Sequence, residues 1–502
     1  MDIAVILLVV ISLVEASMWL EAFGQWRRVL AMIVILVQSI SLGLIVGIDF
    51  NTWSALLLII SAYRLINLLR FIDGKTEPNY LKIVVRRSSL RLIGLQLIIG
   101  LGWLGASHLA ISEKALLLGL SLIDALVVVG LGFSIYKSLN RSQVLKFNNL
   151  AKENLPSLSV LIPARNETVD LEACLTRLLT STYPKLEILV LDDCSQDKHT
   201  PLIIKSFAQA GVRFIAGKQP PKSWLAKNYA YEQLLEQASG DILVFAGVDT
   251  RFSPDSLNNL ITYMLSNDLS MISVMPKNYL KSGLSLASFI MQPVRYAWEL
   301  VVPRYYLKRP PVLSTCWAIY KDKIDNYGSF KAISRSSDPE RYFAAKAYSE
   351  SRAYNFIMAD SKIGLFSQKT FGEQFATAVR TRYPQTHRQI ETVGLLSIAQ
   401  VFIFLEAFYG LIWGLMLSDF AVVALSLVSL ISLSLIYRTI CQQTYLKFLP
   451  LSLIIWPIAV IYDIATLNYS MWQYEFNQVE WKGRNVCLPI MHYQALDQER
   501  LR

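Results

Sequence analysis

Long apolar runs at both ends of this sequence limit the folds open to it more than any other feature. Residues 3–20 form the first run, which is long enough for a helix to cross a bilayer whose apolar core is about 30 Å thick. Seven further runs have the same character: 29–48, 53–70, 92–112, 116–136, 393–417, 420–437 and 447–468. We therefore expect an integral membrane protein with a water-facing domain between two groups of helices. The expected parts are a membrane region of about five helices at 1–150, a domain at 151–390, a membrane region of two or three helices at 391–470 and a polar tail at 471–502.

Basic residues indicate the side of the membrane on which the domain lies. The loops after the first, third and fifth runs contain many lysines and arginines, for example Arg27, Arg86 and Lys146, and the second and fourth loops contain few. Because basic loops stay in the cytoplasm, this alternation predicts a cytoplasmic domain on the inner, or cell, membrane. The net charge of +10 is concentrated beside apolar runs, and no basic groove with stacking aromatic residues appears. We therefore expect no nucleic-acid partner.

Three features leave alternatives open. Pro450 and Pro457 interrupt the last apolar run, which either crosses the membrane or lies at its surface, so the side of the tail is open. Residues 284–306 mix apolar and charged residues, a pattern that fits a helix at the membrane surface or a buried domain helix. Charged residues in or beside the apolar runs either pair, reach the membrane surface or mark a functional site: Glu15, Glu21 and Arg64.

The stretch between residues 158 and 250 alternates short apolar runs with amphipathic segments. The runs at 158–167, 186–191, 212–215 and 241–246 have the length of strands, and helical patterns begin near residues 170 and 226. This alternation predicts an α/β domain with a Rossmann-like, mostly parallel sheet. Ligands of such sheets bind outside the carboxyl ends of the strands.

Polar residues follow the predicted strands at those ends. Asp192 and Asp193 come directly after the second strand, where a carboxylate either accepts bonds from a ribose or base or caps the next helix. Asp249 follows the fourth strand and is placed to hold Mg²⁺ or Mn²⁺ against a diphosphate. Lys227, near a helix start, is placed to meet a phosphate. The sequence therefore predicts a nucleotide site at this edge of the sheet.

Several other kinds of site are disfavoured. No GxGxxG follows the first strand and no GxxxxGK[ST] is present, which argues against a dinucleotide fold and a P-loop. The five cysteines are scattered singly, which indicates reduced thiols and neither a disulfide framework nor a zinc site.

Five short segments, in this order, resemble the family 2 glycosyltransferases, inverting enzymes of GT-A fold that take sugars from nucleotide donors. They are PARNE (163–167), LDDCSQD (191–197), FAGVDTRF (245–252), SSDPERYFAAKA (336–347) and VRTRY (379–383). Two further segments are KQPPKSWLAK (218–227) and WKGR (481–484). The loop at 218–227 and the WKGR tail resemble the branch that glycosylates lipids such as carotenoid acids, hopanoids and ceramide.

The resemblance implies a role for each matching residue. Asp193 would meet a uracil ring, Asp249 would bind the metal, and Asp338 would act as general base with Glu340 as the fallback. The chain departs from the family at Gly247 and Ser337, where the family has acidic residues. Residues that the resemblance places around the nucleotide sugar, its diphosphate or the acceptor are Pro163, Arg165, Glu167, Arg380, Arg382 and Tyr383.

These features predict an inverting transferase that moves a sugar from a nucleotide sugar, in particular a UDP-sugar, to a membrane lipid. The flanking apolar helices favour a lipid acceptor, because a soluble acceptor would not require them. Two alternatives stay open: a processive polysaccharide synthase, and a catalytically impaired membrane subunit that binds the nucleotide sugar.

Overall fold

The computed structural model describes residues 2–48, 52–73, 78–108, 113–141, 154–278, 290, 310–351, 353–367, 369–386, 388–444 and 450–487. The chain divides into two compact units. One comprises Met1–Val128, Ala378–Leu430 and Ile464–Val479, and the other comprises Val129–Thr377, Ile431–Asp463 and Glu480–Arg502. The helix that residues 284–306 were expected to form lies outside the described residues, apart from residue 290.

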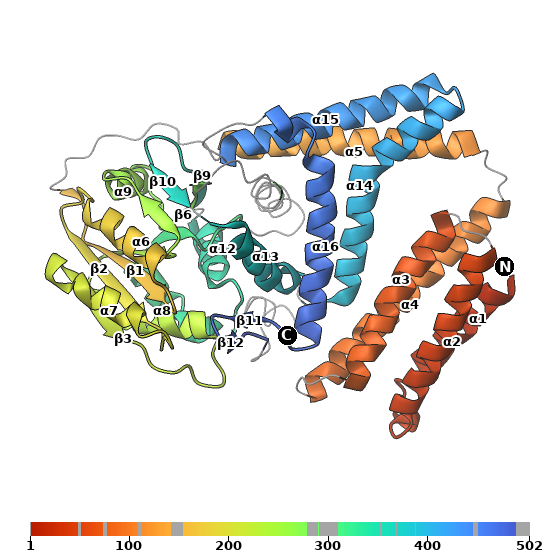
Figure 1. The fold of residues 1–502 in the computed structure, drawn as a ribbon, viewed down its shortest axis with the longest axis horizontal. Helices are drawn as coiled ribbons and strands as arrows, with labels where there is room; N and C mark the ends of the chain where they lie inside the picture. The colour runs from red at the N-terminus through yellow and green to blue at the C-terminus, as the bar shows by residue number, and fades with distance from the viewer. Residues whose placement is uncertain are drawn as a thin grey trace. The chain divides into compact units, whose positions relative to one another are not determined.

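Long helices dominate the first unit and continue into the second (Figure 1). Five of the described helical segments are long and apolar enough to cross a membrane: Arg27–Leu44, Ala55–Asp73, Lys114–Asn140, Ile390–Met416 and Phe420–Thr444. The described residues of the runs expected at 3–20, 92–112 and 447–468 lie mostly in helices, but these helices are not among the five. The long helices are α1 (Asp2–Ser17), α2 (Arg27–Ile48), α3 (Thr52–Asp73), α4 (Pro78–His108), α5 (Glu113–Arg141), α14 (Ile390–Met416), α15 (Phe420–Thr444) and α16 (Trp456–Glu475).

A buried ion pair joins two helices of the first unit. Nη2 of Arg64 on α3 lies 2.5 Å from Oε2 of Glu15 on α1, and both side chains are fully buried. Ser12 and Gln96 accept further hydrogen bonds from the Arg64 guanidinium. Glu21 is exposed. The charges at Glu15 and Arg64 therefore form a structural pair, one of the alternatives that the sequence left open.

The second unit contains a seven-stranded sheet, and the predicted α/β class with a mostly parallel sheet is confirmed. Neighbours pair in parallel except on the two sides of β8, which runs antiparallel to β4 and β6. In sheet order the strands are β3 (Val212–Ala216), β2 (Leu186–Asp192), β1 (Leu158–Ala164), β4 (Ile242–Ala246), β8 (Cys316–Tyr320), β6 (Met271–Met275) and β9 (Tyr354–Met358).

Both faces of the sheet are covered, which is why its strands read as continuous apolar runs. Side chains alternate between the two sides: Val160 and Ile162 pack in one core and Leu161 in the other. The helices α6 (Val169–Leu179), α7 (His199–Ser206) and α9 (Ser256–Ser266) contribute to the first core. The second core takes residues from α8 (Ala226–Gln237) and α12 (Pro339–Ser351).

A second, three-stranded sheet carries side chains toward the end of β4. In it β10 (Leu365–Ser367) pairs antiparallel with β5 (Thr250–Phe252) and parallel with β7 (Lys277–Asn278). A short hairpin, β11 (Glu480–Trp481) and β12 (Arg484–Asn485), follows α16 in the sequence. The remaining elements are η1 (Glu21–Phe23), η3 (Ala208–Ala210), α11 (Lys321–Asn326), η4 (Phe330–Ile333), α13 (Phe371–Gln385) and η5 (Pro450–Leu453).

Candidate functional site

The candidate site lies where β1, β2 and β4 end. The strand order reverses between β1 and β4, since β1 leads outward to β2 and β3 and β4 lies on its other side. A crevice outside the carboxyl ends of the strands at such a point is the usual ligand site of an α/β sheet. The pairing of β1 with β4 ends at Leu161, and Pro163 pairs only with Leu191 of β2. The missing N–H of Pro163 therefore interrupts no hydrogen bond to β4. The strands therefore deliver polar loops to one edge of the sheet.

Arg165 holds these loops together. Its Nη1 donates to the carbonyl oxygens of Asp193 (2.7 Å) and Cys194 (2.5 Å), and its Nε donates to the carbonyl oxygen of Lys482 (3.0 Å). The side chain is 3% exposed. Burial, and then the nearby Arg484, lower the pKa of Arg165. The described hydrogen bonds of the Arg165 side chain thus all go to backbone carbonyl oxygens of the loops that shape the site.

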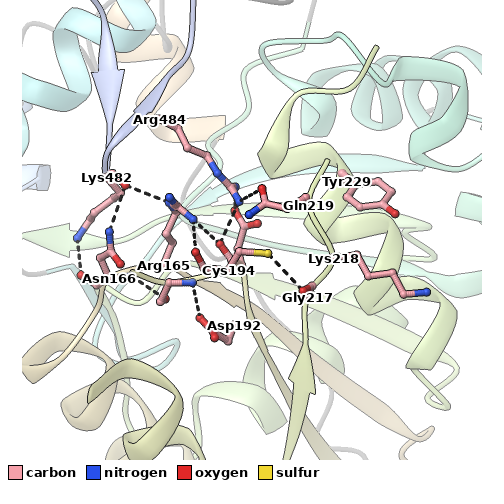
Figure 2. A network of polar contacts seen from close by, with 12 residues as sticks. Arg165, Asn166, Asp192, Cys194, Gly217, Lys218, Gln219, Tyr229, Lys482 and Arg484 are labelled. Atoms are coloured by element: carbon pink, nitrogen blue, oxygen red, sulfur yellow. Dashed lines mark hydrogen bonds and ion pairs between the residues drawn. The ribbon is translucent and has the colours of Figure 1, made fainter. Parts of the chain in front are cut away.

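The C-terminal hairpin rests on these strand ends, and its side chains point toward the β1 and β2 loops in Figure 2. Asn166 donates to the carbonyl oxygen of Lys482 at 3.2 Å. The Lys482 ammonium lies 3.1 Å from Oε1 of Glu167. Burial raises the pKa of Glu167, and Lys482 opposes that rise. The hairpin therefore adds positive charge to an edge at which the strand ends carry carboxylates.

Asp193 is paired with the second basic residue of the hairpin. Nη1 of Arg484 lies 2.5 Å from Oδ2 of Asp193, and Nη2 donates to the Asp193 carbonyl oxygen at 3.2 Å. Asp193 is 3% exposed. Burial raises the pKa of Asp193, and Arg484 opposes the rise. Its neighbour Asp192 instead accepts a bond from the backbone N–H of Ser195, so it caps the turn that follows β2.

Asp249, which follows β4, is held by the three-stranded sheet. Its Oδ2 accepts a hydrogen bond from Ser367 at 2.9 Å and lies 3.3 Å from Nζ of Lys369. Burial alone would raise the pKa of Asp249, but Lys369 and Ser367 outweigh it and the pKa lies below its ordinary value. A Cβ at Gly247 would lie 2.6 Å from Oδ1 of Asp249. The glycine that replaces the family's acidic residue therefore leaves room for the Asp249 carboxylate.

Asp338 and Glu340 stand at the start of α12. Oε2 of Glu340 lies 3.2 Å from Nζ of Lys227, and the carboxylate is buried. Burial raises the pKa of Glu340, and Lys227 opposes the rise. Nη2 of Arg341 lies 3.5 Å from Oδ2 of Asp338, and within the described residues this oxygen accepts no hydrogen bond. Of these two ion pairs, the one of Glu340 is the shorter, at 3.2 Å against 3.5 Å for Asp338.

Arg380, Arg382 and Tyr383 belong to the first unit. Tyr383 is fully buried, and its hydroxyl lies 2.6 Å from Oε1 of Glu475 and 2.9 Å from the Arg388 carbonyl oxygen. Burial, and then Glu475, raise the pKa of Tyr383. The carbonyl oxygen of Arg380 accepts a bond from the Tyr474 hydroxyl at 2.7 Å. In the described structure Tyr383 thus packs inside the first unit.

Four residues that contact the predicted carboxylates were not predicted as site residues from the sequence: Ser367, Lys369, Lys482 and Arg484. The WKGR motif was recognised by its resemblance, but its contacts were not predicted. Lys482 reaches Glu167, and Arg484 reaches Asp193. Gly483 was a usable signal, because glycine readily adopts the positive φ that a two-residue hairpin turn needs. Among the described residues no group of three or more His, Cys, Asp or Glu side chains forms a metal cage.

Comparison with known proteins gives a family match for the α/β part. Residues 159–328 match the family model described as Glycosyl transferase family 2. The chain is 26% identical over 216 residues to the probable glycosyltransferase YdaM of Bacillus subtilis (strain 168), which covers 42% of this chain and 50% of that protein.

Two further relatives have a substrate in their names. The UDP-Glc:alpha-D-GlcNAc-diphosphoundecaprenol beta-1,3-glucosyltransferase WfgD of Escherichia coli is 27% identical over 113 residues, 22% of this chain and 43% of that protein. The 4,4'-diaponeurosporenoate glycosyltransferase of Staphylococcus haemolyticus (strain JCSC1435) is 28% identical over 135 residues, 26% of this chain and 35% of that protein. The chain thus spans half or less of the length of these three relatives.

Proposed function

Residues 159–328 belong to glycosyl transferase family 2, and from this premise we propose that the chain transfers a sugar from a UDP-sugar to a membrane lipid with inversion at the anomeric carbon. One observation carries the proposal. Asp193 and Asp249 follow β2 and β4 at the carboxyl-end edge of a GT-A-type sheet, on either side of β1. A nucleotide that spans this edge meets Asp193 with its base and Asp249 with its diphosphate.

The base and ribose lie over the ends of β1 and β2. The Asp193 carboxylate accepts a hydrogen bond from the uracil ring, and Pro163, Arg165 and Glu167 form the wall of this subsite. Arg165 supports the site through the backbone of Asp193 and Cys194. We give contact with the base to Asp193 and support of the loop to Arg165, because Arg165 is buried and donates to carbonyl oxygens.

The diphosphate lies over the end of β4, beside Asp249. An ionised carboxylate is a hard oxygen ligand, and Mg²⁺ or Mn²⁺ needs only one or two of these when phosphate oxygens and water complete its shell. Asp249 fits this requirement because its pKa is held low. A divalent cation bound there supplies positive charge to the departing diphosphate. Lys369 lies on the same carboxylate and gives way when the donor and its ion bind.

Asp338 takes the proton from the acceptor hydroxyl. The hydroxyl oxygen then forms a bond to the anomeric carbon while the bond between that carbon and the diphosphate oxygen breaks. Lys227 holds Glu340 as an ion pair next to Asp338, so Glu340 is the weaker candidate for the base. Lys227 also adds positive charge to this part of the site.

Arg380, Arg382 and Tyr383 complete the proposal. The resemblance assigns Arg380 and Arg382 to the leaving diphosphate, which they would meet through charge-assisted hydrogen bonds. The fully buried ring of Tyr383 packs against Tyr474 and fixes the end of α13 that carries these arginines.

A lipid acceptor suits a chain whose described residues include five helices that are able to cross a membrane. The names of two relatives, a diphosphoundecaprenol glucosyltransferase and a diaponeurosporenoate glycosyltransferase, support it. We place the chain in the inner, or cell, membrane with the α/β domain on the cytoplasmic side, where basic loops and nucleotide sugars are found.

The test is product analysis. Membranes that contain the chain are incubated with radiolabelled UDP-sugars, and a matched preparation carries Asp338→Asn. Label in the chloroform-soluble fraction that depends on Asp338 supports the proposal. A large water-soluble polymer would indicate a processive synthase, and UDP binding without any transfer would indicate an impaired binding subunit.

A further inference from the structure

The WKGR segment folds as a tight hairpin whose geometry is set by its two central residues. Lys482 and Gly483 both have positive φ, 50° and 76°, which is typical of a two-residue turn of type I′. Trp481 pairs with Arg484 across the turn. A Cβ at Gly483 would lie 3.0 Å from Oε1 of Gln196, so glycine serves both the turn and the close approach to the β2 loop. The hairpin is therefore built to seat its basic residues on the strand ends.

Arg484 is directed at one oxygen of Asp193 and leaves the other available. Its Nη1 bonds Oδ2 at 2.5 Å, and its Nη2 bonds the Asp193 carbonyl oxygen at 3.2 Å and Oε1 of Gln219 at 3.3 Å. Figure 2 shows the guanidinium groups of Arg484 and Arg165 beside each other above the Cys194 loop. Within the described residues no side chain bonds Oδ1 of Asp193. The carboxylate is thus oriented from one side and offers a second acceptor.

The charge on Asp193 depends on this contact. Burial raises the pKa of Asp193, and Arg484, followed by Arg165, opposes the rise, while Asp192 adds to it. The Cys194 thiol donates to the Gly217 carbonyl oxygen at 3.3 Å, and burial, followed by Asp193, raises the pKa of Cys194. Removal of Arg484 would leave the backbone-bonded Arg165 as the remaining cation, so the pKa of Asp193 would rise further.

We propose that Arg484 is a positioning residue that makes the site specific for uracil over cytosine. Held as a carboxylate, Asp193 accepts a hydrogen bond from the N3–H of uracil and repels the N3 lone pair of cytosine. A protonated Asp193 would instead donate to N3 of cytosine, so loss of the charge removes the discrimination. This inference rests on the proposed function, because it takes the base to lie at Asp193.

The experiment measures the binding of UDP and CDP to the full chain in detergent micelles by isothermal titration calorimetry. The titrations are repeated between about pH 5.5 and 8 to follow the protonation of Asp193. The variants are Arg484→Met, which removes the cation, and Arg484→Lys, which keeps it. Lys482→Met is the matched control, since it removes a cation of the same hairpin that faces Glu167.

We expect the wild-type protein at pH 8 to prefer UDP over CDP by at least about tenfold, the size of a charge-assisted hydrogen bond. In Arg484→Met the preference falls by about tenfold, and the pH below which it is lost moves upward. Arg484→Lys restores most of the preference, and Lys482→Met keeps the wild-type ratio although both affinities fall.

An unchanged UDP-to-CDP ratio and pH profile in Arg484→Met would overturn the inference while leaving the proposed function intact. Equal losses of UDP and CDP affinity at every pH would reduce Arg484 to a structural residue and overturn it as well. If the wild-type protein binds neither nucleotide, the proposed function itself fails, and the two failures are thereby distinguished.

Discussion

Lys369 lies on the carboxylate of Asp249, with its Nζ atom 3.3 Å from Oδ2. Both side chains are 20% exposed, so the pair is shielded but not sealed from water. The contact places a protein cation where the proposed divalent ion would bind. Lys369 and the ion are therefore expected to compete for Asp249.

Replacement of Lys369 by methionine should favour the ion. The half-saturating Mn²⁺ concentration for UDP binding should fall by about twofold to fivefold, the range expected for a partly exposed ion pair. Titration of Mn²⁺ at fixed UDP checks this. An unchanged Mn²⁺ requirement would show that Lys369 does not compete with the ion.

Substitution of Gly247 by alanine should impair the same site. The new Cβ would meet Oδ1 of Asp249 at 2.6 Å, so the carboxylate has to turn away from the diphosphate. We expect transfer activity to fall by about tenfold, which corresponds to about 1.4 kcal/mol of lost transition-state stabilisation. Gly372→Ala is the control, because a Cβ there meets nothing within 4 Å. Full activity in Gly247→Ala would contradict the assignment of Asp249.

The α/β class was predictable because the first four strands of the sheet are local apolar runs, whereas β6, β8 and β9 were not predicted. Continuous apolar runs predict buried parallel strands, and β1, β2, β3 and β4 lie within a residue or two of the predicted runs, apart from the polar end of the first. The polar residues at the strand ends were predictable because they directly follow these runs in the sequence. The side chains that contact them were not predictable, because they come from distant parts of the sequence. Ser367 reaches Asp249 across 118 residues, and Arg484 reaches Asp193 across 291.

Asp338 and Glu340 should differ in their effect on catalysis. Asp338→Asn removes the proposed base and should lower kcat by about 10²–10⁴-fold. Glu340→Gln leaves Lys227 without its counter-ion and should have a smaller effect on kcat than Asp338→Asn. Single-turnover transfer rates compare the two variants. If Glu340→Gln were the more damaging, the base assignment would move to Glu340.

Cys194 should be the cysteine that reacts in the native protein. It is partly exposed, whereas Cys174, Cys316, Cys441 and Cys487 are buried. Burial raises the pKa of Cys174 and of Cys316 to about 12, so both stay protonated at neutral pH.

Reaction with N-ethylmaleimide followed by peptide mass spectrometry measures this difference. Burial, and then Asp193, raise the pKa of Cys194 as well, so its labelling rate should climb with pH by up to about tenfold per unit while the thiol is mostly protonated. UDP bound at Asp193 should protect Cys194 from labelling. Labelling that UDP does not affect would argue against a base at the end of β2.

The buried pair of Glu15 and Arg64 should stabilise the helices only as a pair. Arg64→Met leaves Glu15 buried without a counter-charge and should cost about 3–5 kcal/mol of stability. The double variant Glu15→Leu with Arg64→Met should recover most of that loss. Thermal unfolding in detergent compares these with Arg28→Met, an exposed control. Equal stability of the single and double variants would show that Glu15 does not need Arg64.

A cryo-electron microscopy structure of the full chain with UDP and Mn²⁺ tests the account most directly. We predict density for uracil against Asp193 and for the diphosphate with its ion against Asp249, with Lys369 displaced from that carboxylate. Nucleotide bound at another surface, or an ion that does not contact Asp249, would contradict the account.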